Sequence, residues 1–72
     1  MPQEKNLIRK EGMVTEALPG ALFRIKVDQG EEVLGRPSGR MQLHRIRILP
    51  GDRVLLEFTP YDTKRCRIIH RL

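Results

Sequence analysis

The chain has 72 residues, of which 39% are hydrophobic and 32% charged, with a formal charge of +5 and a single cysteine. A chain this short forms one small domain that buries about 60% of the surface of its unfolded state, which excludes a deep catalytic cavity. One cysteine excludes an internal disulfide, and no apolar run approaches the ~20 residues of a membrane span, so we expect a soluble, intracellular protein.

Alternating apolar and polar side chains predict five β-strands. In chain order they cover residues 7–17, 21–27, 31–36, 52–59 and 65–72. Inside the first of them, Gly12 predicts a bulge or a tight bend. The turns after the first two strands contain Gly20 and Gly30, which supply the backbone freedom that tight turns need. Residues 1–6 are polar, and we expect a flexible tail there before a single domain at residues 7–72.

A long connection from Ser38 to Leu49 separates the third and fourth predicted strands. Three strands, a long connection and two further strands are the layout of the five-stranded OB-fold Greek-key barrel, an all-β fold. The connection is long enough for a helical turn or two, and Ile46 and Ile48 are expected to hold its second half against the barrel. The sequence therefore predicts an all-β barrel with a short helical turn between strands three and four.

Basic residues are concentrated in the second half of the chain. Residues 1–35 contain five Lys or Arg and six Asp or Glu, whereas residues 36–72 contain nine and three. Eight of those nine cations are arginine, whose planar guanidinium suits bidentate contacts with phosphate. The asymmetry predicts a polyanionic partner and salt-sensitive binding, although a basic surface can also serve solubility alone.

The candidate RNA contacts come from the long connection and from the last loop and strand. We expect them to form one patch if the fifth strand runs beside the connection. Ser38 and Gly39 are expected to set the geometry of the loop. Met41 has two interpretations: it caps the open end of the barrel, or it acts as an apolar wedge against RNA. The full set of candidate contacts is Arg40, Met41, His44, Arg45, Arg47, Lys64, Arg65, Arg67 and Arg71.

Aromatic residues are scarce, with two Phe, one Tyr and no Trp. OB folds usually bind single strands by stacking bases on aromatic side chains, so this deficit argues against a single-strand binder of cold-shock type. It favours contacts with the backbone and shallow minor groove of folded RNA, where arginine and loop shape matter more than stacking.

Catalysis is not expected from this sequence. Cys66 and His70 are the most suggestive pair, but residues four apart in a strand are separated by about 13 Å, too far for proton transfer. Together with His44 they also lack the spacing of metal ligands, so we expect neither a metal nor another cofactor. Cys66 is expected to be a small core or lining residue.

Several motifs, in their order and spacing, resemble bacterial translation initiation factor one, and plastid forms share the pattern. The resemblance covers roughly residues 7–71. The motifs are Glu-Gly-x-Val-x-Glu-Ala-Leu-Pro at residues 11–19, Phe-Arg-Ile-Lys-Val at 23–27, Ser-Gly-Arg-Met at 38–41, Ile-Arg-Ile-Leu-Pro-Gly-Asp-Arg-Val at 46–54, Thr-Pro-Tyr-Asp at 59–62 and Arg-Ile-Ile at 67–69.

This resemblance implies a non-enzymatic factor that binds the decoding (A) site of the small ribosomal subunit and blocks premature tRNA entry. It implies small-subunit ribosomal RNA, small-subunit proteins and initiation factors two and three as partners. We expect a monomer in the cytoplasm, or alternatively in the plastid stroma. By position, the contacts that the resemblance implies are Arg40, Met41, His44, Arg47, Arg67 and Arg71.

The chain departs from the family's usual residues in several places. A cation is gained at Arg36 and Arg45 and lost at Gln42, and Cys66 replaces a residue that is usually glycine. Two other functions remain open from the sequence. A general RNA chaperone of cold-shock type would bind unstructured oligonucleotides as well as it binds the subunit, and a protein-interaction barrel would bind its partner even at high salt.

Overall fold

The computed structural model describes residues 7–72, and within them the chain forms five strands and one short helix. The elements are β1 (Ile8–Leu18), β2 (Leu22–Val27), β3 (Glu32–Pro37), α1 (Gly39–Leu43), β4 (Arg53–Thr59) and β5 (Asp62–Arg71). This confirms the predicted all-β barrel with a short helix between the third and fourth strands. The tail expected at residues 1–6 lies outside the described residues.

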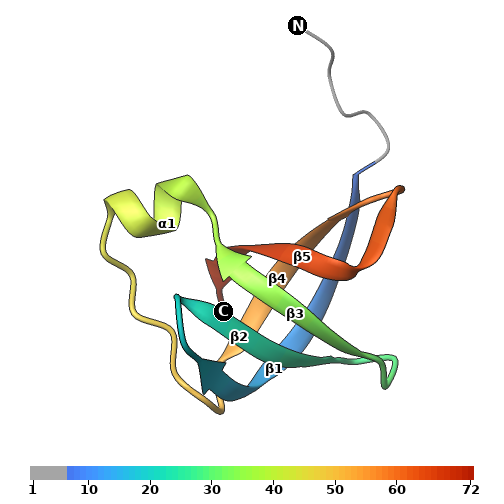
Figure 1. Ribbon diagram of the computed structural model, residues 1–72, viewed down its shortest axis with the longest axis horizontal. Coiled ribbons are helices and arrows are strands. Elements are labelled where there is room, and N and C mark those ends of the chain that lie inside the picture. Colours follow the sequence, from blue (N-terminus) through green and yellow to red (C-terminus); the bar gives the residue numbers. More distant parts are fainter. Residues whose placement is uncertain (1–6) are drawn as a thin grey trace, which may run out of the picture.

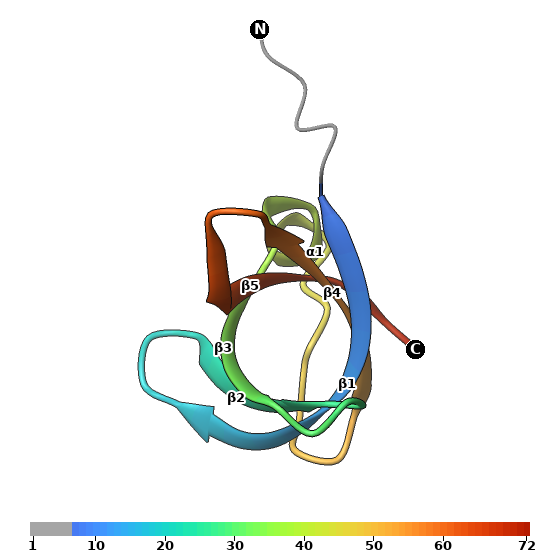
Figure 2. The same ribbon diagram turned by 90° about the vertical axis from the view of Figure 1, so that its right-hand side faces the viewer.

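The sheet closes on itself in the order β1-β2-β3-β5-β4. β1 is long enough to pair twice, through residues 8–13 with β4 and through residues 12–18 with β2. Among the strand pairs that residues 7–72 form, only β3 and β5 run parallel, with Leu34 opposite Arg65 and Pro37 opposite Ile68. Figure 2 looks along the ring of strands, and Figure 1 shows α1 outside it, beyond the end of β3. A closed sheet of this kind leaves no strand edge free.

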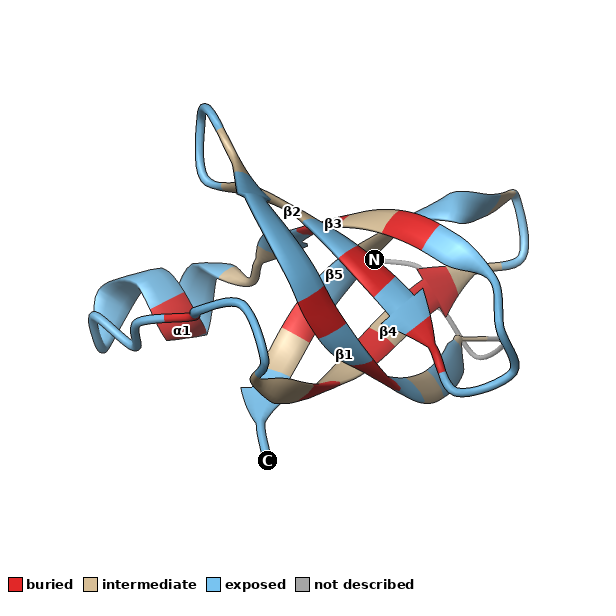
Figure 3. Ribbon diagram, turned by 90° about the horizontal axis from the view of Figure 1, so that it is seen from below, coloured by how far each residue is buried: buried red, intermediate tan, exposed pale blue. Residues whose placement is uncertain are grey.

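The core fills the inside of this ring and follows from the alternation of side chains along each strand. In β4, Val54, Leu56 and Phe58 are buried while the residues between them are partly exposed. Figure 3 shows the same alternation of buried and exposed positions on the other strands. The buried hydrophobic residues are Val14, Ile25, Val27, Val33, Met41, Ile48, Val54, Leu56, Phe58 and Ile68.

The turn between β4 and β5 is shorter than the sequence predicted. β5 begins at Asp62 rather than at residue 65, so the loop expected over residues 59–64 is a tight turn at Pro60 and Tyr61. Asp62 Oδ1 accepts the backbone N–H groups of Lys64 and Arg65 at 2.9 and 3.0 Å, the pattern of an Asx turn, which fixes the chain where it leaves the turn. These hydrogen bonds also hold the pKa of the Asp62 carboxyl below its ordinary value.

Gly12 lies where β1 pairs with both of its neighbours, opposite Val27 on β2 and Val54 on β4. The irregular pairing of β1 lies further along, between Val14 and Glu16, so of the two alternatives predicted at Gly12 the bulge is wrong. The other alternative, a bend at a barrel corner, fits a residue at which β1 passes from pairing with β4 to pairing with β2. A Cβ at Gly12 would lie 2.8 Å from the carbonyl oxygen of Lys26 and 2.9 Å from an Ile25 methyl. The glycine is therefore needed because the backbone of β2 approaches so closely.

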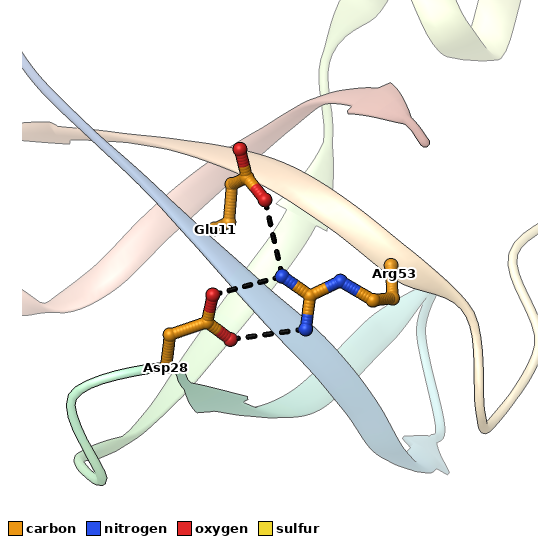
Figure 4. A network of polar contacts seen from close by, with 3 residues as sticks. All are labelled: Glu11, Asp28 and Arg53. Atoms are coloured by element: carbon orange, nitrogen blue, oxygen red, sulfur yellow. Dashed lines mark hydrogen bonds and ion pairs between the residues drawn. The ribbon is translucent and has the colours of Figure 1, made fainter.

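Arg53 connects β4 to β1 and to the turn after β2 (Figure 4). Its two terminal nitrogens donate to the carboxylate of Asp28 at 3.0 and 2.8 Å, and one of them also donates to Glu11 at 3.0 Å. The hydrogen bond from Arg53 lowers the pKa of Asp28. Because this pKa is lower in the folded state than in the unfolded state, the stabilisation is complete above the ordinary value and is lost as pH falls through the lowered one.

Candidate nucleic-acid interface

The start of α1 is fixed by Ser38 and by its contact with β5. Ser38 Oγ accepts the backbone N–H of Met41 at 3.3 Å, which is the usual role of a serine that caps a helix. The backbone N–H of Ser38 donates to the carbonyl oxygen of Ile68 at 2.9 Å. The Gln42 side chain donates to the carbonyl oxygen of Pro37 at 3.0 Å. These contacts fix the position of α1 at the end of β3.

Met41 and Leu43 lie on opposite sides of α1. Met41 is 1% exposed and belongs to the core, whereas Leu43 is 78% exposed. Residues two positions apart on a helix point in nearly opposite directions, so docking one exposes the other. Met41 therefore caps the barrel, which is one of its two predicted interpretations, and the other, a contact with RNA, stays a prediction. Leu43, which the sequence patterns did not single out, is the most exposed apolar side chain of the connection between β3 and β4, where Leu49 and Ile46 are exposed to a smaller extent.

α1 ends in a Schellman motif that has arginine where glycine is usual. The backbone N–H of Arg45 donates to Gln42 O at 3.1 Å, and that of Ile46 donates to Met41 O at 3.0 Å. Arg45 has a φ angle of +53°, which glycine adopts freely and other residues adopt at a cost. Its side chain makes no hydrogen bond or ion pair with the rest of residues 7–72. Arg45 thus holds a strained backbone conformation while its side chain adds no contact that stabilises the fold. This combination points to a contact between the Arg45 side chain and another molecule.

Arg45→Gly should raise the free energy of unfolding by about 0.5–1 kcal/mol and lower RNA affinity. Glycine relieves a left-handed conformation that costs about 1–2 kcal/mol, and the greater entropy of its unfolded chain cancels part of the gain. Arg45→Ala is the matched control, because it removes the charge and keeps the strain. It should lose affinity without gaining stability. Urea unfolding measures the stabilities, and a destabilised Arg45→Gly protein would contradict this account of the helix end.

The segment after α1, residues 44–52, runs along the end of the barrel to β4 and is called the return segment. Ile48 is 6% exposed and part of the core, whereas Ile46 is 40% exposed. Ile48 therefore holds the segment as predicted, whereas Ile46 is only partly covered and contributes less. The Arg71 guanidinium donates to the carbonyl oxygen of Arg47 at 3.0 Å. Arg71 thus has a structural role, because it ties this segment to the end of β5.

The candidate cations do not all lie together. The second half of β5 does run beside α1 and the return segment, as the contacts of Ile68 and Arg71 show. Arg67 belongs to this part, next to its register partner Arg36 on β3. Lys64 and Arg65 lie at the other end of β5, and six residues of strand span about 20 Å. The predicted single patch therefore holds for Arg67 and Arg71, while Lys64 and Arg65 lie apart from α1.

Ion pairs within residues 7–72 involve only cations of β1, β2 and β4, namely Arg9, Lys10, Arg24 and Arg53. In the same part of the chain, the cations around α1 and on β5 form none. Their charge is therefore not neutralised by the fold and is available to an external anion. These cations are Arg36, Arg40, Arg45, Arg47, Lys64, Arg65, Arg67 and Arg71.

Cys66 is half-buried and lines the barrel, as predicted. Its thiol donates to the carbonyl oxygen of Leu34 at 3.5 Å, and a Cβ at Gly35 would lie 3.0 Å from the sulfur. Burial, with a smaller effect of Asp62, raises the pKa of the thiol to about 12. The thiol is therefore protonated at neutral pH and is a poor nucleophile.

Metal-binding clusters and membrane-spanning helices are both absent from residues 7–72. This part of the chain contains no group of three or more His, Cys, Asp or Glu residues placed to hold a metal ion. No helix in the same range has the length and apolar character needed to cross a membrane.

A closed five-stranded barrel with unneutralised arginines at one end defines a small basic OB-fold protein of the RNA-binding class. The chain matches the translation initiation factor 1A / IF-1 family over residues 1–72 and belongs to that family. This confirms the resemblance seen in the sequence motifs. The role of this family in translation initiation is of a non-enzymatic kind.

The solved structures that are similar to this chain include the following two. Translation initiation factor one from the Wolbachia endosymbiont strain TRS of Brugia malayi is 46% identical, with a TM-score of 0.81 over 97% of this chain and 83% of that chain. YjeQ from Thermotoga maritima is 27% identical, with a TM-score of 0.72 over 90% of this chain and 23% of that chain. The second match shows the same barrel as part of a longer protein.

Proposed function

We propose that this initiation factor binds the decoding (A) site of the small ribosomal subunit through contacts with ribosomal RNA. There it blocks premature tRNA entry and assists initiation factors two and three. It acts as a monomer, without enzymatic activity, in the cytoplasm or in the plastid stroma. Residues 7–72 serve as a single RNA-binding domain, and the small-subunit proteins beside the decoding site are further partners.

The observation that carries this proposal is the position of α1. The helix stands outside the barrel (Figure 3) and is anchored by its one buried side chain, Met41. Arg40 on the helix and Arg47 on the return segment are exposed and form no ion pair within residues 7–72. A short projection with cations on both sides suits the wide, shallow minor groove of an RNA helix, where phosphates and 2′-hydroxyls are the accessible groups.

In this proposal Leu43, rather than Met41, makes the apolar contact with the RNA. Its side chain is exposed at the last residue of α1, between Arg40 and Arg45 in the chain. Apolar side chains of this kind insert against base pairs in other proteins that bind a minor groove. His44 follows directly and is also exposed, so it remains a candidate contact.

Arg40→Ala and Arg47→Ala should each weaken binding to the small subunit by about 1–3 kcal/mol and leave the stability of the barrel nearly unchanged. Each removes one guanidinium that has no ion-pair partner within residues 7–72. Lys26→Ala is the matched control, since it removes an exposed cation from β2, away from α1. Subunit pelleting with and without initiation factors two and three measures the affinity.

Chemical footprinting of the decoding helix completes this experiment. The parent protein and Lys26→Ala should protect the helix, and Leu43→Ala should reduce the protection. If subunits bind the protein and the decoding helix shows no protection, the result contradicts the proposal. Affinity that stayed constant at high salt would instead indicate a protein-interaction barrel, because phosphate contacts release counterions and weaken with salt.

A further inference from the structure

Arg71 differs from the other candidate cations because its guanidinium has a hydrogen-bond partner in the protein. It donates to the carbonyl oxygen of Arg47, in the return segment, at 3.0 Å. Within residues 7–72, no other cation around α1 or on β5 makes a hydrogen bond through its side chain. The side chain of Arg71 is therefore engaged by the fold, whereas those of the other cations are not.

The strand register directs the Arg71 side chain over the end of the barrel. Arg71 lies opposite Val54 on β4, and the next residue, Leu72, donates its backbone N–H to the carbonyl oxygen of Arg53 at 2.8 Å. Partners in an antiparallel pair project to the same side of the sheet, and Val54 is fully buried inside the barrel. The Arg71 side chain therefore starts from a paired strand, on the inner side of the sheet, and reaches the return segment at the barrel end.

Both ends of the return segment are fixed without Arg71. At its start, the backbone N–H of Ile46 donates to the carbonyl oxygen of Met41 at 3.0 Å. At its end, residues 49–52 form a turn, and the backbone N–H of Gly51 in that turn donates to the carbonyl oxygen of Val14 on β1 at 2.7 Å. Residues 47 and 48 lie between these two fixed points.

Residues 47 and 48 are held by the buried side chain of Ile48 and by the bond from Arg71. That bond is the only hydrogen bond within residues 7–72 that reaches the backbone of either residue. A hollow of about 410 Å³ borders the same stretch, with Phe23, Arg47 and Ile48 in its lining, so packing alone supports the segment incompletely. Because the bond holds the peptide group between Arg47 and Ile48, it fixes the orientation of Arg47 toward solvent and of Ile48 toward the core.

We propose that Arg71 is a positioning residue of the RNA interface, which fixes the return segment so that Arg47 is presented to the RNA. In this role Arg71 does not itself contact a phosphate, which differs from the contact that the family resemblance implies. A charged donor suits the task, because its hydrogen bond to a carbonyl oxygen is stronger than that of a neutral donor. The inference rests on the proposed function, in which Arg47 contacts RNA.

A double-mutant cycle on small-subunit affinity tests the proposal. Arg47→Ala should weaken binding roughly tenfold, and Arg71→Ala by a similar or smaller factor. Because Arg71 acts through Arg47, the double variant should bind as weakly as Arg47→Ala alone, within about twofold. The control cycle pairs Arg71→Ala with Arg67→Ala. These two residues lie about 13 Å apart along β5, so their losses should multiply.

Backbone order parameters from NMR relaxation of the free protein give a second readout, which needs no RNA. Arg71→Ala should lower the values for residues 46–48 from about 0.85, typical of rigid backbone, toward about 0.6, while β4 keeps its values. Arg67→Ala should leave all of them unchanged. Arg71→Lys keeps a charged donor on a long side chain, so it should restore most of the order and most of the affinity. Circular dichroism melting confirms that each variant is folded.

Unchanged order parameters in Arg71→Ala would overturn the proposal. So would losses that multiply in the Arg47 and Arg71 cycle, because they would assign Arg71 to a phosphate contact of its own. The proposed function fails by a different result. If subunits bind the parent and the decoding helix shows no protection, the decoding-site function is contradicted, while the cycle and the order parameters still decide the role of Arg71.

Discussion

Met41→Ala should lower the free energy of unfolding by about 2–5 kcal/mol, the range for truncating a buried methionine. The side chain is 1% exposed and is the buried residue of α1, at the end of the barrel core. Its removal leaves a cavity that the closed ring of strands cannot easily fill. It also removes the apolar anchor of α1, so we expect weaker binding to the small subunit even where the variant remains folded.

Met41→Leu is the matched control, because it nearly conserves volume and should cost less than about 1.5 kcal/mol. Urea unfolding followed by circular dichroism compares the two variants with the parent. The experiment also separates the two interpretations of this residue. A Met41→Ala protein as stable as the parent but unable to bind the subunit would contradict the cap and would restore Met41 as a direct RNA contact.

Gly12→Ala should destabilise the barrel by about 1–3 kcal/mol or more, as expected for overpacking. The new Cβ would lie 2.8 Å from the carbonyl oxygen of Lys26, which belongs to the backbone of β2 and cannot rotate away. Relief therefore requires β1 and β2 to separate where β1 also pairs with β4. Thermal and urea unfolding should both show the loss.

Gly39→Ala provides the comparison, since a Cβ at this position would have no atom within 4 Å. Gly39 lies in the first turn of α1, where alanine favours the helix by up to about 1 kcal/mol. We expect this variant to be as stable as the parent or more stable. A Gly12→Ala protein with unchanged stability would show that β1 and β2 can move apart freely at this point.

The barrel could be predicted because its signals are local. The alternation of apolar and polar side chains that predicts a strand is present in the sequence itself, for example in Val54, Leu56 and Phe58 of β4 and in Phe23, Ile25 and Val27 of β2. The position of the long connection then selected the topology. The start of β5 was missed because it depends on pairing across the turn, with Asp62 opposite Thr59 on β4, whereas the residue types from Thr59 to Lys64 are typical of a loop.

The candidate interface could be predicted only in outline. A helix of five residues is too short to show a periodicity, so the chain alone did not reveal that Met41 faces the core and Leu43 faces solvent. The left-handed backbone conformation of Arg45 depends on how the helix ends. The sequence does not indicate it, because glycine is the residue that usually marks such a position. The separation of Lys64 from α1 follows from the parallel pairing of β3 and β5. The RNA contacts themselves stay predictions.

The parallel pair that closes the barrel also has a kinetic consequence. The β1–β2, β2–β3 and β4–β5 pairs join strands that are adjacent in the chain, whereas the β1–β4 and β3–β5 pairs join strands that are distant in it. Contacts between distant segments carry a larger loop-closure entropy, so the hairpins form early and these two pairs form later. Because Ser38 bonds to Ile68 only once β3 and β5 lie side by side, α1 acquires its final position after the hairpins have formed. A partly folded chain exposes the same arginines without the helix that arranges them.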